Sequence, residues 1–212
     1  MKLGKLFGVM MAIFMVSQTT HAETEPKNRI VASYGSGDAD IKLSGTTYDG
    51  DLSGSSISGT FYFGDSLWAI VGFGSSELEI AGVNIEQELT GFGGGLVFGD
   101  HIDLTAGEGE EFRVGIIQYD FETSQGSTKS TDDATYAGAS YETGLGDGLT
   151  LGFYFNTDTA DIFSDNDYSV DLIKSLGSNV ILGFGYEYSK AVTNSQNSSD
   201  SKIFSVGVGF LF

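Results

Sequence analysis

The sequence predicts an all-β fold, a transmembrane up-and-down antiparallel β-barrel of ten strands, or of eight if one hairpin is misread. Three observations predict it. Apolar residues recur at every second position in many segments, with small or polar residues between them, as in strands that present one face to lipid. Beyond the leader, no stretch approaches the roughly 18 consecutive apolar residues of a spanning helix. The only proline, Pro26, precedes the first expected strand. This position fits a sheet protein, because proline has no N–H to donate to a neighbouring strand.

The segment Ser201–Phe212 has the clearest period of two. Ser205, Gly207 and Gly209 alternate in it with a row of apolar residues, namely Phe204, Val206, Val208, Phe210 and Phe212. In these residues the chain resembles the closing strand of bacterial outer-membrane β-barrels, whose assembly machinery reads a terminal Phe that follows alternating apolar residues. The resemblance implies that the five residues form an assembly signal and that the barrel assembly machinery is a partner during insertion.

The first residues have the composition of a secretory signal peptide. Lys2 and Lys5 precede an apolar run, Leu6–Val16, of about half the length of a spanning helix, and Thr20-His21-Ala22 fits a small-residue cleavage site. We therefore expect a signal peptide over residues 1–22 and one outer-membrane barrel domain over residues 23–212.

Composition excludes several function classes. The net charge is −19 at pH 7, and no cluster of Lys and Arg offers a surface for phosphates, so nucleic acid is not an expected partner. The chain contains no cysteine, which excludes disulfides, thiol catalysis and thiolate metal sites.

The first two strands are expected on either side of a polar loop. The first runs from about Arg29 to Leu43, with a bulge near its glycines because the apolar positions change parity there. Ser44–Asp51 is expected to be a loop. The second strand alternates up to Phe63, and residues 64–66 form a tight turn.

The next three strands are less regular. One begins at Leu67, and a short connection at Ala81–Asn84 leads to a strand that ends at Phe98, before a turn at Gly99–His101. The following segment, residues 102–122, is longer than the roughly 9 to 11 residues of a tilted membrane strand. Its apolar set changes parity beside Gly115, which predicts a second bulge.

The remaining strands alternate regularly through Tyr141, Phe153, Val170 and Phe184 up to the closing strand. Tight turns, expected at residues 144–148 and 176–178, alternate with longer polar loops at Ser124–Asp133, Asp158–Asn166 and Ala191–Asp200. Short turns on the periplasmic side and long loops outside are typical of outer-membrane barrels. Residues 23–212 thus resemble the small barrels of Gram-negative bacteria, the OmpX-like, opacity-like and small porin-like group, which implies contact with outer-membrane lipid and lipopolysaccharide.

Enzymes of this barrel class, such as lipid A deacylases, phospholipases, omptin-type proteases and palmitoyl transferases, rely on a histidine. His21 belongs to the expected leader, and His101 lies in an expected periplasmic turn, far from an extracellular nucleophile. We therefore expect no enzymatic activity, no catalytic residues and no cofactor.

Four acids are expected to face the lumen, namely Asp120, Glu142, Asp171 and Glu187, with Arg113 as their counter-charge. Buried carboxylates need partners, or they bind protons or cations. Two interpretations stay open: a hydrogen-bonded polar core, or the lining of a narrow cation-preferring pore. Barrels of this size are usually filled by their own side chains, which favours the first interpretation.

A second acidic set, Asp158, Asp161, Asp165 and Asp167, resembles a calcium loop in composition only, since its spacing does not match an EF-hand. We assign no metal site and keep these four as a candidate for loosely bound divalent ions shared with lipopolysaccharide.

The expected function is that of a non-enzymatic barrel whose polar loops serve envelope integrity or surface interaction, such as adhesion. The alternative is a small porin-like channel that prefers cations.

Overall fold

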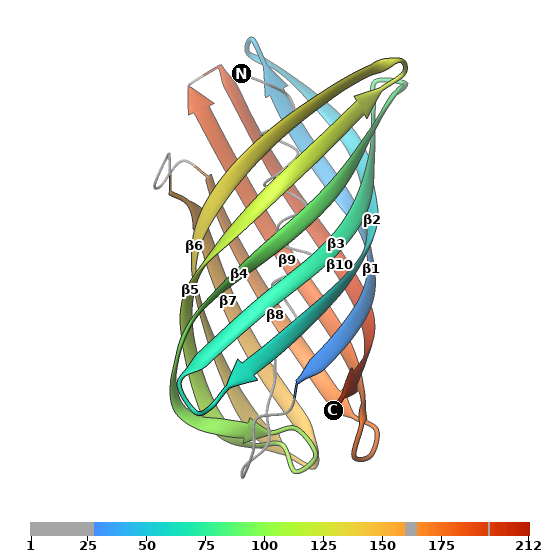
Figure 1. Ribbon diagram of the computed structural model, residues 1–212. Helices are drawn as coiled ribbons and strands as arrows, with labels where there is room; N and C mark the ends of the chain where they lie inside the picture. The colour runs from blue at the N-terminus through green and yellow to red at the C-terminus, as the bar shows by residue number, and fades with distance from the viewer. Residues whose placement is uncertain (1–27, 160–164, 195) are drawn as a thin grey trace.

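The computed structural model describes residues 28–159, 165–194 and 196–212. In this part of the chain ten antiparallel strands form a closed barrel in which each strand pairs with the next and β1 pairs with β10 (Figure 1). The predicted fold class and the count of ten strands are confirmed. No helix in the described part is long and apolar enough to cross a membrane. The expected signal peptide lies outside the described residues.

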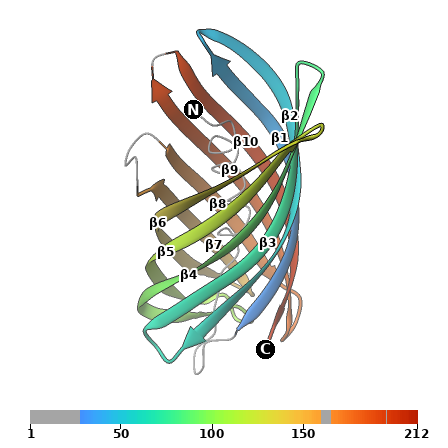
Figure 2. The same cartoon turned by 45° about the horizontal axis from the view of Figure 1, so that its top comes forward.

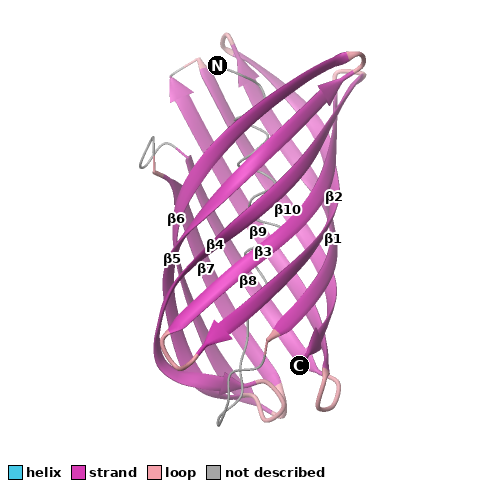
Figure 3. Cartoon of the chain, viewed as in Figure 1, coloured by secondary structure: helices cyan, strands magenta, loops and turns pink. Residues whose placement is uncertain are grey.

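The strands are long and strongly tilted, and short turns join most of them (Figure 3). β4 has 21 residues, about twice what a tilted strand needs to cross a bilayer. The barrel therefore extends well beyond the thickness of a membrane. The strand bounds are β1 (Arg29–Leu43), β2 (Thr46–Phe63), β3 (Leu67–Ile80), β4 (Val83–Asp103), β5 (Glu108–Gln125), β6 (Thr128–Gly146), β7 (Leu149–Asp158), β8 (Asp165–Ser175), β9 (Val180–Asn194) and β10 (Asn197–Leu211).

Side-chain polarity inverts along the barrel axis. We call the end where β1 begins and β10 ends the lower end, as in Figure 1. Around the lower half the outward side chains are apolar and exposed, and they form what we call the apolar belt: Ile30, Tyr34, Ile57, Phe63, Leu67, Val71, Phe73, Phe92, Leu96, Phe98, Phe112, Ile116, Tyr141, Phe153, Tyr168, Val170, Leu172, Phe184, Tyr186, Phe204, Val206, Val208, Phe210 and Phe212. A continuous apolar surface of this extent is stable only against lipid or another apolar partner.

In the upper half the arrangement is the opposite. The inward side chains form an apolar cluster that includes Ala39, Ile41, Leu52, Leu78, Ile85, Leu89, Ile117, Tyr119, Phe121, Ala134, Tyr136, Ala191 and Ile203. The outward side chains there are mainly acidic or hydroxylated. This half has the pattern of a barrel in water, with the apolar residues inside.

Neither predicted bulge is present, and the inversion of polarity explains the change of apolar parity instead. The register of β1 is continuous against β2 and β10, and the register of β5 is continuous past Gly115 against β4 and β6. The bulge predictions near the β1 glycines and at Gly115 are therefore wrong. Apolar residues change faces because the surroundings of the wall change from lipid to water, while the strand itself keeps its pleat.

Several predicted loops and turns are also different. Most of Ser44–Asp51, Ser124–Asp133 and Ala191–Asp200 is strand, because backbone ladder bonds form irrespective of side-chain polarity. The upper connection between β1 and β2 is only Ser44–Gly45. At the lower end, β4 continues through the expected turn at Gly99–His101, and the turn lies at residues 104–107. The alternation of long and short connections is thus not seen among the described residues.

The β4–β5 turn closes the lower end. It crosses beneath the barrel (Figures 1 and 2), and the backbone N–H of Gly148, in the β6–β7 turn, donates to the carbonyl of Ala106 at 2.9 Å. Leu104, which is 1 % exposed, packs in a second apolar cluster with residues of β1, β8, β9 and β10, namely Val31, Ile173, Ile181 and Leu211. One turn thus reaches the far wall and covers the lower mouth.

Candidate functional site

An ionic network centred on Arg113 occupies the lumen just above this turn. Arg113 of β5 donates from Nε to Ser140 Oγ and from Nη1 to Tyr62 Oη, each at 3.1 Å. Its Nη2 bonds the Glu142 carboxylate, and its Nε lies 3.1 Å from Glu111 Oε1. Both carboxylates are buried, and they compensate the buried guanidinium.

Further polar groups surround this pair of acids. Tyr154 of β7 donates its hydroxyl to Glu142 at 2.8 Å. Arg29, which is fully buried at the start of β1, lies within electrostatic range of Glu142 and Tyr62. The network therefore ties β1, β2, β5, β6 and β7 together across the lumen.

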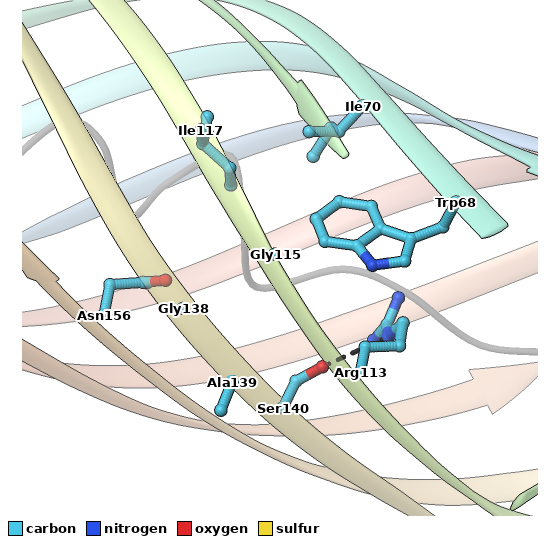
Figure 4. A pocket seen from close by; sticks show the side chains of 9 residues that line it. All are labelled: Trp68, Ile70, Arg113, Gly115, Ile117, Gly138, Ala139, Ser140 and Asn156. Atoms are coloured by element: carbon cyan, nitrogen blue, oxygen red, sulfur yellow. Dashed lines mark hydrogen bonds between the residues drawn. The ribbon is translucent and has the colours of Figure 1, made fainter. Parts of the chain in front are cut away.

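A small cavity of about 20 Å³ lies beside the network, between β3, β5 and β6 (Figure 4). The Trp68 indole faces the lumen there, with its ring centroid 6.0 Å from Arg113 Cζ, and donates to the carbonyl of Val114 at 3.3 Å. A Cβ at Gly115 would lie 2.5 Å from the Trp68 ring, so the glycine makes room for the indole. The cavity has room for about one water molecule.

Three of the four predicted lumen acids face the lumen, and the fourth faces outward. Glu142, Asp171 and Glu187 face inward and are buried. Asp120 faces outward on β5 and is exposed. Its predicted position is wrong because it depended on the bulge at Gly115, which does not form.

In the part of the chain that the structure describes, three further acids are buried in the lumen, namely Glu111, Asp158 and Asp167. Glu111 shares the parity of Arg113 on β5, and an unbroken register would have identified it. The sequence pattern likewise identifies Arg29 only as the start of a strand.

Of the acidic set proposed for loosely bound divalent ions, the structure describes two side chains, so the set as a whole stays a prediction. Asp158 and Asp167 face the lumen, and Asp167 accepts a hydrogen bond from Ser189 at 2.7 Å. Asp161 and the side chain of Asp165 lie outside the described part. Among the described residues no group of three or more His, Cys, Asp or Glu side chains could hold a metal ion.

The five closing-strand residues all face outward, four on β10 and Phe212 directly after it, with exposures from 43 % for Val208 to 67 % for Phe204. Aromatic contacts mark both borders of the belt: Phe61 with Phe212 at the lower border, and Tyr186 with Phe204 at the upper border. Aromatic girdles at these two levels are typical of transmembrane barrels.

Acidic side chains cover the outer wall above the belt on β1 to β6. We call them the acidic collar: Asp38, Asp40, Asp49, Asp51, Glu77, Glu79, Glu86, Glu88, Asp120, Glu122 and Asp133. Several stand directly opposite another acid on the neighbouring strand, such as Asp38 and Asp51, Glu77 and Glu86, and Glu88 and Glu122. Like charges in such positions repel each other.

His101 lies below the apolar belt, next to the outward-facing Asp100 on β4. Its Nδ1 is 2.9 Å from Glu111 Oε2, and its ring packs edge-on against Tyr62 with centroids 5.9 Å apart. The hydrogen bond to Glu111 raises the pKa of His101 above its ordinary value, although partial burial opposes the shift.

The raised pKa predicts a pH dependence of stability. A group whose pKa is higher in the folded state adds stability below about pH 6.5, and this contribution is lost as the pH rises through the folded-state pKa. We expect the unfolding midpoint to fall across that interval and the His101→Gln variant to lack this step. Urea titrations in detergent at a series of pH values would measure it, and an identical step in the variant would assign the titration to another group.

Comparisons with known proteins show what this barrel is similar to. No protein-family model and no curated protein matches the chain. Among solved structures, the translocator domain of autotransporter NalP from Neisseria meningitidis is 13 % identical, with a TM-score of 0.51 and coverage of 98 % of this chain and 94 % of that one.

Two further solved structures also match. Neisserial surface protein A is 16 % identical with a TM-score of 0.46, covering 87 % of this chain and 97 % of that one. OprG from Pseudomonas aeruginosa is 10 % identical with a TM-score of 0.41, covering 91 % and 98 %. The likeness to the NalP domain, together with the closed ten-strand topology, shows that the chain has the fold of outer-membrane β-barrels.

Proposed function

We propose that this protein is a non-enzymatic integral barrel of the Gram-negative outer membrane, which presents the acidic collar at the cell surface for envelope integrity or surface interaction. The observation that carries the proposal is the inversion of polarity along the barrel axis. The belt fits the acyl chains of outer-membrane lipid, and the collar begins where the belt ends. A wall with acids outside and apolar residues inside is stable in water.

We infer the direction of insertion from the end at which the hairpins extend beyond the apolar belt. In transmembrane barrels the long hairpins lie outside and the short turns lie in the periplasm. The collar hairpins are then extracellular, at the level of the lipopolysaccharide head groups. His101 is bonded to Glu111 near the opposite end, away from the surface where a substrate would arrive.

A small cation-preferring channel is the second candidate. The buried lumen acids Asp171 and Glu187 favour it. The β4–β5 turn across the lower mouth and the Arg113 network oppose it, because both lie in the path that an ion would take.

Cysteine labelling of whole cells tests the proposed topology, since the chain has no native cysteine. Glu88→Cys and Phe98→Cys change two outward positions on β4, one in the collar and one in the belt. We expect a membrane-impermeant maleimide to label only the Glu88→Cys protein. Labelling of both variants, or of the collar variant only after cell lysis, would contradict the proposal.

Two measurements on the purified protein test the barrel itself and then separate the two candidates. We expect a barrel-type mobility shift between unboiled and boiled samples on a denaturing gel, and no steady conductance steps in planar bilayers. Cation-selective steps would establish the channel instead. Recovery of the protein in the soluble periplasmic fraction, with no mobility shift on boiling, would exclude both candidate functions.

A further inference from the structure

The lumen contains more carboxylates than cationic groups. Among the described residues the buried inward acids are Glu111, Glu142, Asp158, Asp167, Asp171 and Glu187, and the buried inward guanidiniums are those of Arg29 and Arg113. Glu111 and Glu142 pair with Arg113. Burial of the remaining negative charge is costly unless something positive accompanies it.

Asp171 is poorly compensated, because the Arg29 guanidinium lies within electrostatic range of it but does not hydrogen-bond to it. It is fully buried, and neither of its carboxylate oxygens has a hydrogen-bond partner. Its two cross-strand neighbours are glycines, Gly152 on β7 and Gly185 on β9. Neither neighbour therefore places a side chain beside Asp171.

Oxygen atoms occupy the room that the two glycines leave. A Cβ at Gly185 would lie 2.6 Å from Asp171 Oδ1 and 2.5 Å from Ser205 Oγ, and a Cβ at Gly152 would lie 2.6 Å from the Tyr154 hydroxyl. The two glycines thus let a carboxylate and two hydroxyl groups gather on the inner wall of β7 to β10.

Glu187 extends this group of oxygens upward along β9. It is 6 % exposed, and its Oε1 has no hydrogen-bond partner. It lies two residues beyond Gly185, the cross-strand neighbour of Asp171, and the carboxylates of Asp167 and Asp171 are both within electrostatic range of it. Two neighbouring buried carboxylates with unpartnered oxygens repel each other, and a cation between them removes that repulsion.

We propose that Asp171 and Glu187, with the hydroxyl of Ser205, form a luminal site for one small monovalent cation such as Na⁺ or K⁺. Hard cations bind carboxylate and hydroxyl oxygens. A dehydrated divalent ion fits less well, because in the described part of the chain no three acidic side chains converge. The site is independent of whatever the acidic collar binds.

The test is the heat-induced mobility shift of the purified protein in zwitterionic detergent, followed against temperature. NaCl or KCl is compared with choline chloride at equal ionic strength, since choline is too large to fit between the two carboxylates. We expect the wild-type midpoint to be higher in Na⁺ or K⁺ by at least about 2–4 °C, the shift that corresponds to modest stabilisation of a chain of this size.

The double variant Asp171→Asn/Glu187→Gln should lose the difference between salts and should melt above the wild type in choline chloride. The matched control, Glu88→Gln/Glu122→Gln, removes two carboxylates from the collar and should keep the difference. Equal wild-type midpoints in all salts would overturn the proposal, as would loss of the difference in the control alone. A midpoint that rises on acidification but ignores alkali cations would also overturn it, because a proton would then neutralise the pair.

Discussion

Replacing Arg113 with Met is expected to lower the free energy of unfolding by about 3–5 kcal/mol, because Glu111 and Glu142 would remain buried without their counter-charge. The change also removes the donors to Ser140 and Tyr62. Urea unfolding in detergent, followed by the gel mobility of the folded band, would measure the loss.

Lys129→Met is the matched control, since it removes a cation from an exposed ion pair with Glu122 on the same two strands. We expect its midpoint to match that of the wild type. Adding Glu142→Gln to Arg113→Met should restore part of the stability, since one uncompensated charge disappears. An Arg113→Met protein as stable as the wild type would show that the lumen is hydrated enough to solvate both acids.

The second large effect is expected at Phe184, which is 55 % exposed near the middle of the belt on β9. Phe184→Arg should cost about 2–4 kcal/mol in a bilayer, the usual cost of a cation on the lipid face at mid-depth. Refolding into vesicles followed by urea titration would measure it.

Lys190 provides the comparison for Phe184, because it lies on the same outward face of β9 but above the belt. Lys190→Glu should change stability by less than about 0.5 kcal/mol. Equal effects at the two positions would contradict the expectation that lipid surrounds only the lower half of the barrel.

Much of the wall was predictable because alternation is local. The outward rows of β2, β7, β9 and β10 follow from a period of two in short segments, and so does the inward position of Glu142, Asp171 and Glu187. The aromatic residues of β10 likewise lie where alternation places them.

The errors about bulges and loops share one cause. A change of apolar parity looks the same in a sequence whether a strand bulges or passes from lipid into water. A bulge would turn Asp120 inward, whereas a strand that passes from lipid into water keeps it outward. The continuous register of β5 supports the second explanation. The polar segments that were expected to be loops are strands that stand above the membrane. Their acids face outward into water, so a polar outer face does not indicate a loop there.

By itself, then, the sequence determined a closed sheet with an apolar outer face, because alternation, turn residues and the absence of long apolar runs are properties of neighbouring residues. Only the tertiary structure decided which residues meet inside. The bond between Arg113 and Tyr62, the contact of Leu104 with the far wall and the gathering of oxygens around Asp171 join strands that are distant in the chain. Such contacts depend on the tilt and closure of the barrel, which no single segment specifies.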